Sequence, residues 1–163
     1  MNTPRPLPSA AGDDDASRRV SLRDWAALVR QLQSCLVDHV GRRLSDLDMP
    51  FLQWALMLRL GRRGPCTLAE LARELRADGA TLMRAVDRAE DRGLLSRERC
   101  TTDRRLVYLQ PTEAGQKVIE RIWSEVVWVQ QRYLEGFSDG ERQQLLGFLE
   151  RMAVNAEGLD RLA

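Results

Sequence analysis

The sequence has little cysteine and almost no histidine. Cys35, Cys66 and Cys100 lie far apart without a CxxC pair, and His39 is the single histidine in 163 residues. Structural zinc sites need Cys or His ligands at characteristic spacings, so no metal site is predicted. Because the thiols are sparse and no secretory signal is recognisable at the N-terminus, we expect reduced cysteines rather than disulfides.

Long hydrophobic runs are also absent. No stretch approaches the roughly 18 consecutive apolar residues that a membrane span requires. We therefore expect a cytoplasmic protein with no membrane partner. At 44% hydrophobic and 30% charged residues, the chain is nonetheless long enough for one globular domain with a buried core.

The motifs of an enzyme are missing as well. The chain has no Gly-rich phosphate loop and no GxSxG, and one histidine does not supply a nucleophile, a base and an orienting group. Acidic residues mostly stand beside Arg at helical spacing, such as Glu74 beside Arg73 and Asp87 beside Arg84, which predicts solvated ion pairs on helix faces. The sequence therefore predicts neither catalysis nor a cofactor.

Opposite charges almost cancel. The chain has 25 basic and 24 acidic residues, a formal net charge of +1, and every basic residue except Lys117 is Arg. The total charge alone does not predict a nucleic-acid partner. Arg, however, makes bidentate contacts with guanine edges and with phosphate, so the placement of the arginines carries more information than their sum.

The two ends of the chain differ from its middle. Residues 1–20 hold several Pro residues and an acidic run but few large apolar groups, which predicts a flexible N-terminal tail. Residues 21–163 are predicted to form a single domain. Apolar residues recurring every three or four positions predict long amphipathic helices over residues 21–47 and, after two hydroxyl-bearing caps, over 112–136 and from 138 onward.

The middle, about residues 50–111, has the element order of a winged helix-turn-helix. The first predicted elements are a helix from Pro50 that ends at 61–65 and a short helix from Thr67 to about Arg76, which a capping box with Glu70 opens. A turn at 77–79, a helix over 79–92 and a β-hairpin of 94–99 and 106–110 follow. The predicted fold class is therefore mainly α with a small β-hairpin wing, flanked by N- and C-terminal dimerisation helices.

The second helix and the hairpin carry specific motifs. A hydroxyl-bearing helix start is followed by Arg, by Val-Asp-Arg, by Arg-Gly-Leu and, in the hairpin, by Asp-Arg-Arg; the matching positions are Arg84, Val86, Asp87, Arg88, Arg92, Gly93, Leu94, Asp103, Arg104, Arg105, Thr112 and Gly115. In these residues the chain resembles the MarR family of bacterial transcriptional regulators, and the resemblance extends from residue 21 to the C-terminus. Met83, Ala89 and Pro111 depart from the family's usual residues, and these departures predict an unusual base preference.

The resemblance implies a sequence-specific, DNA-binding transcriptional regulator. In such proteins the wing arginine enters the minor groove and the aspartate holds it in place, which implies those roles for Arg105 and Asp103. A narrow minor groove has an enhanced negative potential that attracts a guanidinium. The predicted DNA-binding residues are Thr67, Ala80, Thr81, Met83, Arg84, Arg88, Asp103, Arg104 and Arg105.

A homodimer is predicted because the long helices carry more apolar surface than the winged motif can cover, and the resemblance implies the same for residues 21–47 and 112–163. Two-fold symmetry then requires a pseudo-palindromic double-stranded operator with half-sites about one helical turn, roughly 10 base pairs, apart.

Family members commonly bind small aromatic or phenolic acids between the dimerisation helices and the DNA-binding lobe. The resemblance therefore implies a ligand-responsive repressor that such an effector releases from its operator. An aromatic wall with one hydrogen-bond donor and one cation suits an aromatic carboxylate. The predicted ligand-binding residues are Trp25, Cys35, His39, Trp54 and Arg59.

Two alternatives remain open. A thiol-based redox-sensing regulator would use Cys35, Cys66 or Cys100, of which Cys100 in the wing is the more exposed candidate. A winged-helix protein-interaction module would use the same motif without binding DNA, and the near-neutral segment 67–110, with nine Arg against eight acidic residues, is compatible with it.

Overall fold

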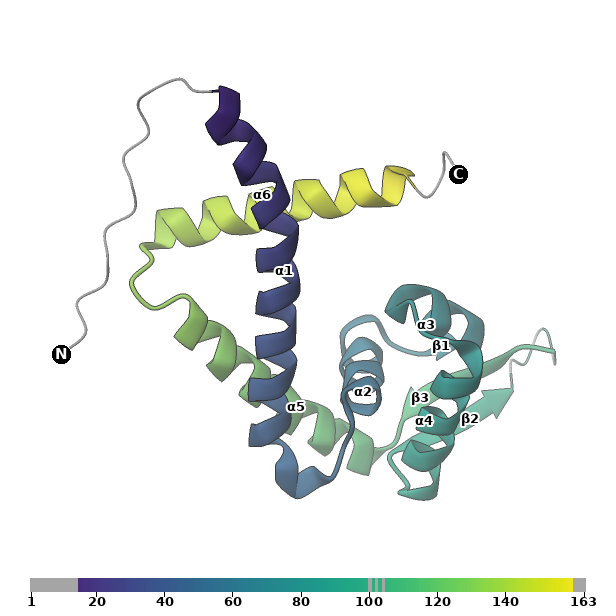
Figure 1. Ribbon diagram of the computed structural model, residues 1–163. Coiled ribbons are helices and arrows are strands. Elements are labelled where there is room, and N and C mark those ends of the chain that lie inside the picture. The colour runs from purple at the N-terminus through teal and green to yellow at the C-terminus, as the bar shows by residue number, and fades with distance from the viewer. Residues whose placement is uncertain (1–14, 100, 102, 104, 160–163) are drawn as a thin grey trace. The chain divides into compact units, whose positions relative to one another are not determined.

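The computed structural model describes residues 15–99, 101, 103 and 105–159. The chain divides into two compact units, Met1–Val37 and Asp38–Ala163. The elements in chain order (Figure 1) are α1 (Asp15–Arg43), the 3-10 turn η1 (Ser45–Leu47), α2 (Phe51–Arg63), β1 (Cys66–Thr67), α3 (Leu68–Leu75), α4 (Gly79–Asp91), β2 (Leu95–Arg99), β3 (Val107–Pro111), α5 (Glu113–Tyr133) and α6 (Asp139–Leu159). The predicted class, helices with a small β wing, is confirmed.

The first helix begins earlier than predicted. Residues 15–20 were expected to belong to a flexible tail, but α1 already starts at Asp15. No Gly or Pro occurs between Asp15 and Gly41, so nothing in that stretch interrupts a helix. The rest of the predicted tail, residues 1–14, lies outside the described residues.

The second helix ends within the predicted range 61–65, after passing through Gly61. Pro50 is the N-cap of α2 rather than part of its first turn, and the helix runs past Gly61 to Arg63. A Cβ atom at Gly61 would lie 2.5 Å from Cγ2 of Ile119 on α5, so this glycine permits a close approach of two helices. The helix stops at Gly64, whose φ is +77°.

The predicted helix caps are confirmed. The Thr67 side chain and Glu70 form a reciprocal capping box at α3, and hydrogen bonds from Thr67 lower the pKa of the Glu70 carboxyl. Thr112 caps α5, and Ser138 and Glu141 make a second reciprocal pair before α6. Local sequence therefore determines where these helices begin.

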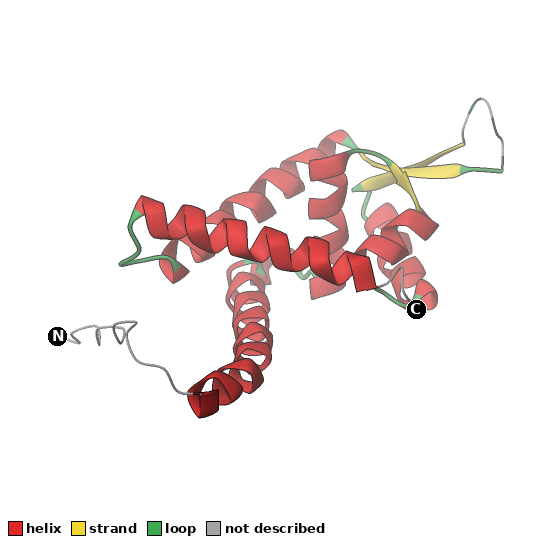
Figure 2. Cartoon of the chain, turned by 90° about the horizontal axis from the view of Figure 1, so that it is seen from above, coloured by secondary structure: helices red, strands yellow, loops and turns green. Residues whose placement is uncertain are grey.

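The wing is part of a three-stranded antiparallel sheet in the order β1-β3-β2. In the hairpin, Arg97 pairs with Leu109 and Arg99 with Val107. The short strand β1, absent from the prediction, pairs Cys66 with Leu109. A two-residue strand gives no periodicity to read in a sequence. Figure 2 shows the β2–β3 hairpin extending away from the neighbouring helices.

The core of the second unit is built around α2, which contacts α3, α4, α5 and β3. Its buried apolar residues face those of α4 and α5. The fully or nearly fully buried side chains include Leu56, Met57, Leu60, Leu71, Leu82, Val86, Ala89, Ile122 and Val129. Burial of these groups supplies the main driving force for folding and fixes α4 against the rest of the unit.

The start of α5 is packed directly on the turn that follows α4. Gly93, directly after the predicted helix 79–92, has a φ of +68°, the left-handed conformation that commonly ends a helix. The Thr112 hydroxyl donates to the Gly93 carbonyl (2.6 Å), and the Thr112 N–H donates to the Leu94 carbonyl (3.1 Å). A Cβ atom at Gly115 would lie 2.0 Å from that same Leu94 oxygen. Only glycine fits at this position.

We predict that Gly115→Ala lowers the free energy of unfolding by about 2 to 3 kcal/mol, because the added methyl must displace backbone. Urea unfolding followed by circular dichroism measures the change. The matched control is Gly41→Ala in α1, where a Cβ meets no atom within 4 Å; its stability should be unchanged or higher by at most about 1 kcal/mol. Equal stability of the two variants would contradict the tight junction.

Candidate functional site

The pair α3 and α4 forms the predicted helix-turn-helix. Arg76 ends α3 in the left-handed region (φ +48°), and the Ala77 N–H donates to the Ala72 carbonyl (3.0 Å) to close the turn. The Asp78 carboxylate then caps α4 by accepting from the Thr81 N–H (2.8 Å), a cap that the sequence reading, which began this helix at Gly79, did not assign. The buried face of α4 consists of Leu82, Ala85, Val86 and Ala89.

The opposite face of α4 is exposed and carries the predicted base-contacting residues, Ala80, Thr81, Met83, Arg84 and Arg88. Arg84 donates to the Thr81 hydroxyl (3.1 Å) and Arg88 donates to the Arg84 carbonyl (3.3 Å). Within the part of the chain that the structure describes, neither guanidinium has a carboxylate at ion-pair distance. Both positive charges are therefore available to an anionic partner.

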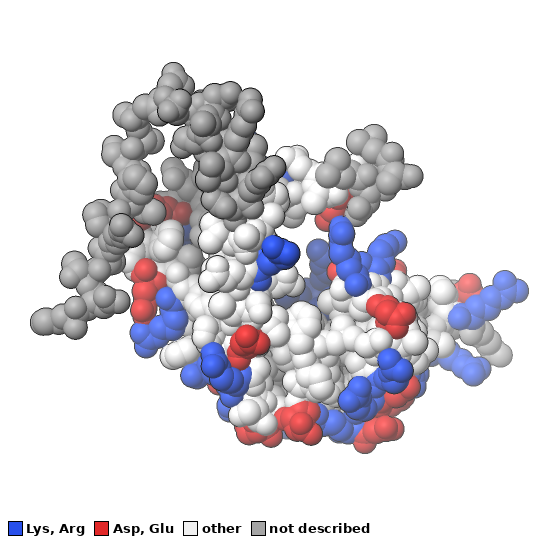
Figure 3. All heavy atoms as spheres, in the orientation of Figure 1, with Lys and Arg blue, Asp and Glu red and all other residues white. Residues whose placement is uncertain are grey.

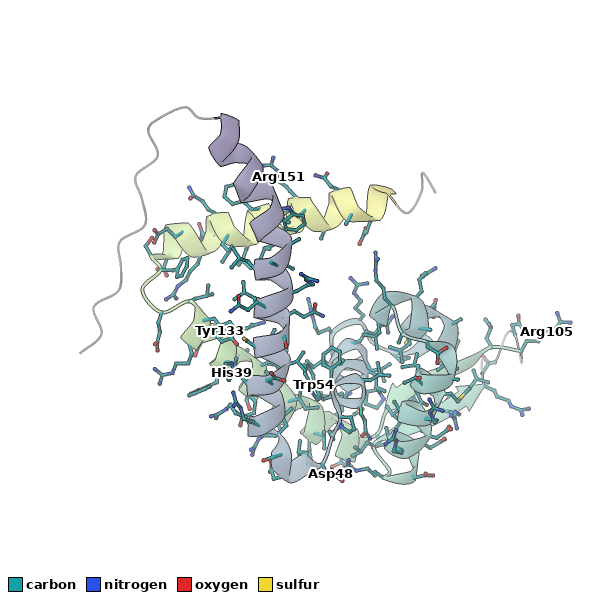
Figure 4. The ribbon with its side chains drawn as sticks, in the orientation of Figure 1. His39, Asp48, Trp54, Arg105, Tyr133 and Arg151 are labelled. Atoms are coloured by element: carbon teal, nitrogen blue, oxygen red, sulfur yellow. The ribbon has the colours of Figure 1, made fainter. Side chains whose placement is uncertain are left out.

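The wing tip carries a further exposed arginine, Arg105. The Asp103 carboxylate accepts from the backbone N–H of Arg105 (3.0 Å), and the Asp103 carbonyl accepts from Leu106 N–H (3.0 Å). The aspartate thus organises the turn through the backbone rather than by pairing with the Arg105 side chain. Figure 4 shows Arg105 at the far end of the hairpin. Arg104 and Cys100, both predicted as candidate residues, lie outside the described residues.

Thr67 differs from the other predicted DNA-binding residues. Its side chain is half-buried and its hydroxyl both accepts from Glu70 N–H (3.3 Å) and donates to the Glu70 carboxylate (2.9 Å). The structure therefore shows Thr67 as the cap of α3, with its hydrogen bonds used inside the protein.

Unlike the arginines on the exposed face of α4, two other arginines of the winged helix pair with carboxylates. Arg59 donates one hydrogen bond to the Gly64 carbonyl (2.8 Å) and two to the Glu74 carboxylate (2.7 and 2.9 Å). The two bonds to the carboxylate lower the pKa of Glu74. Arg97 pairs with Asp87 and Glu90. The expectation that Glu74 and Asp87 pair with arginines of their own helices is wrong, because their partners are arginines from α2 and β2. Figure 3 shows basic and acidic side chains interspersed over this part of the surface.

A pocket of about 380 Å³ lies between the last turns of α1 and the C-terminal half of α5. Two aromatic side chains, one histidine and three arginines line it. Its lining residues are His39, Arg42, Arg43, Trp128, Val129, Arg132 and Tyr133. The Tyr133 hydroxyl and Nδ1 of His39 are 2.6 Å apart, and the Arg43 guanidinium lies 3.8 Å from the centre of the Trp128 ring while it also pairs with Glu125.

Comparison with known proteins identifies this architecture. Residues 47–106 match the model of the MarR family. The transcriptional regulator PA3341 is 29% identical, with 82% of this chain and 98% of that chain covered and a TM-score of 0.76. The winged-helix segment, residues 47–106, is therefore of the MarR type. The chain shares the fold of that family, and the solved structures that it resembles are transcriptional regulators.

Two further solved structures share the MarR-family fold at lower identity. A putative MarR-family regulator from Listeria monocytogenes, complexed with 26mer DNA, is 24% identical, covers 82% of this chain and 87% of its own, and has a TM-score of 0.71. BpsR of Bordetella bronchiseptica, whose DNA binding 6-hydroxynicotinic acid regulates, is 22% identical, with 80% and 98% covered and a TM-score of 0.69. At these identities they show the fold alone.

The predicted ligand-binding residues lie apart from one another. His39 lines the pocket between α1 and α5. Trp54 is 6% exposed and packs edge-to-face on Phe51, with ring centroids 4.9 Å apart; Figure 4 shows it on the other side of α1 from His39. The Arg59 guanidinium is held by Glu74. Trp25, which is exposed, and half-buried Cys35 belong to the N-terminal unit.

Trp128, Tyr133 and the arginines of the pocket are not among the ligand-binding residues predicted from the sequence. Their spacing on α5, at positions 128, 132 and 133, marks one helix face, but only the fold brings that face against His39. Among the described residues, no cluster of three potential metal ligands occurs, and no helix has the length and apolar character needed to cross a membrane.

Proposed function

We propose that this protein acts in the cytoplasm as a sequence-specific regulator that binds a double-stranded operator through α4 and the wing. The observation that supports the proposal most directly is the exposed face of α4, where Arg84 and Arg88 carry positive charges without a carboxylate partner among the described residues. The Listeria relative that was solved with 26mer DNA supports the same use of the fold.

The proposed contacts follow from the geometry of a winged helix. Residues near the N-terminus of α4, Ala80, Thr81, Met83 and Arg84, enter the major groove, where Arg84 has the reach and the donors for a guanine edge. Arg88, one turn later, contacts phosphate. Arg105 at the wing tip enters the minor groove, whose negative potential attracts it, and Arg104 lies next to it in sequence.

The operator-binding form is proposed to be a homodimer. Large apolar side chains are exposed on α6, among them Leu146, Phe148, Leu149 and Met152. A contiguous apolar surface of this kind is costly in water and is typical of a subunit interface. Two recognition helices related by a two-fold axis would read half-sites about one helical turn, roughly 10 base pairs, apart.

Ligand-responsive repression by a small aromatic or phenolic acid is the proposed mode of regulation. The pocket beside His39 is lined by an indole ring, by a phenol hydrogen-bonded to His39 and by three arginines, two of which also pair with glutamates. Aromatic and basic side chains together suit a planar anion. BpsR, whose DNA binding 6-hydroxynicotinic acid regulates, supports this class of effector. A ligand that binds better to a dimer with misplaced recognition helices would lower operator affinity by that difference in affinity.

A thiol-based switch is less well supported by the described cysteines. Cys66 is 2% exposed in the sheet, and burial raises the pKa of its thiol, which disfavours the reactive thiolate. Cys35 is half-buried. A protein-interaction module is the alternative from another functional class. DNA-binding measurements distinguish such a module from a DNA-binding regulator.

We predict that Arg84→Ala and Arg105→Ala each weaken operator binding by about 10- to 100-fold, since each removes a contact worth about 1 to 3 kcal/mol. Fluorescence anisotropy with duplexes selected by the wild-type protein from a random-sequence pool, at two salt concentrations, measures the loss. Lys117→Ala, on the exposed N-terminal part of α5, is the charge-matched control and should bind normally. Normal binding by both Arg variants would overturn the assigned interface.

We predict that Leu149→Glu dissociates the dimer, because it places a charge in the apolar stripe of α6. Val154→Glu is the control, since Val154 lies on the other side of the same helix and is 67% exposed. Sedimentation velocity gives the oligomeric state of each variant, and circular dichroism confirms that both are folded. A Leu149→Glu protein that sediments as the wild type does would exclude this face from the interface.

We predict that His39→Ala weakens both the binding of an aromatic acid and the DNA release it causes by about tenfold, the effect of losing one hydrogen-bonding group in a pocket. Tryptophan fluorescence titration with 6-hydroxynicotinic acid and a series of hydroxybenzoic acids gives affinities, because Trp128 lines the pocket. Asp38→Ala, at the neighbouring exposed position of α1, should behave as wild type. Unchanged affinity and release for His39→Ala would exclude the pocket.

A further inference from the structure

The recognition helix carries acidic residues close to the surface that is proposed to face DNA. Asp87 and Glu90 follow Met83 at four and seven positions, so the three side chains share the side of α4 that faces β2. Asp87 is about half exposed and Glu90 is 35% exposed. Two uncompensated carboxylates at this place would repel the phosphates of an approaching duplex.

One arginine from the wing neutralises this side of the helix. Nη2 of Arg97 donates to the Asp87 carboxylate (2.6 Å) and lies 3.6 Å from the Met83 sulfur, while Nη1 donates to the Glu90 carboxylate. These bonds raise the pKa of the Arg97 guanidinium further above its ordinary range. The side chain is 34% exposed, so its charge is largely engaged within the protein.

Arg97 therefore differs from the other arginines near the proposed interface. Arg84 and Arg88 bond only to a hydroxyl and to a backbone carbonyl, and their charges remain available. Arg97 instead connects two elements, because it belongs to β2 and both of its carboxylate partners belong to α4. The same contacts that remove negative charge also fix the wing strand against the recognition helix.

We propose that Arg97 is a positioning residue that makes α4 competent to bind DNA: it neutralises Asp87 and Glu90 and holds the wing in register with the helix, without itself contacting the duplex. The inference rests on the proposed function. It explains how a segment with nearly equal numbers of basic and acidic residues presents a positive surface: the acids nearest the duplex are compensated by an arginine that does not serve as a contact.

The test uses a set of neutralising variants in the full-length protein. Arg97→Gln alone leaves two unpaired carboxylates and should weaken binding to wild-type-selected duplexes by about tenfold or more, as expected when one partner of a charge pair is removed. The triple variant Arg97→Gln/Asp87→Asn/Glu90→Gln removes the carboxylate charges as well and should bind within about threefold of wild type. Thermal unfolding of each variant shows that the fold is retained.

The dependence of affinity on salt distinguishes positioning from direct contact. A phosphate-contacting arginine would lower the slope of log affinity against log salt by about 0.9 in both the single and the triple variant. A positioning arginine leaves the triple variant with the wild-type slope. The inference would be overturned if the triple variant failed to recover affinity. It would also be overturned if the salt slope of that variant were lower than the wild-type slope by about 0.9, the value for one phosphate contact.

The outcome also separates this inference from the function on which it rests. If the wild-type protein selects no duplex, the proposed function fails, and the inference fails with it. If the wild type binds and Arg97→Gln binds equally well, only the inference is overturned. Arg84→Ala should weaken binding without being rescued by Asp87→Asn and Glu90→Gln, because Arg84 pairs with neither carboxylate.

Discussion

The close packing between the α4–β2 turn and the start of α5 constrains the rest of the winged helix. The Leu94 carbonyl occupies the space that a side chain at position 115 would need, and Thr112 holds the carbonyls of Gly93 and Leu94. Since β2 begins at Leu95, this one junction sets the direction of both the recognition helix and the wing. A helix that reads one groove and a hairpin that reaches the next must be fixed relative to each other, and backbone packing does this with little freedom.

Pairing between arginines and carboxylates determines which positive charges of the winged helix stay exposed. Arginines that join elements, such as Arg59 to Glu74 and Arg97 to Asp87, use their charge to orient helices and strands. Arginines at the exposed face of α4 keep theirs, because no described carboxylate reaches them. Net charge therefore says little about nucleic-acid binding in this protein. What matters is which arginines have an acidic neighbour in three dimensions.

Local signals in the sequence were sufficient for most of the fold. Hydroxyl and carboxylate residues three apart marked the starts of α3 and α6, and Gly93 marked the end of α4, because caps depend on adjacent residues alone. Features that depend on distant residues were missed. Gly61 was assigned only to the segment that ends the second helix, although it also permits the close approach of Ile119, and the partner of Asp87 was expected on its own helix. The predicted ligand-binding residues were chosen by residue type, without knowledge of which side chains meet in the fold. Of these residues, only His39 lines the pocket described here.

A continuous set of contacts joins that pocket to the end of the recognition helix. Arg43 pairs with Glu125, and Arg121 lies 3.2 Å from Glu125 and 3.8 Å from Asp46 in η1. The Leu47 carbonyl, at the end of η1, accepts from Arg92 at the end of α4 (2.8 Å). A carboxylate ligand that competes with Glu125 for Arg43 would act on this chain of contacts at its first member. Contact alone transmits nothing, however: operator affinity changes only by as much as the ligand's affinity differs between two arrangements of the helix, and the operator must alter the ligand's affinity by the same factor.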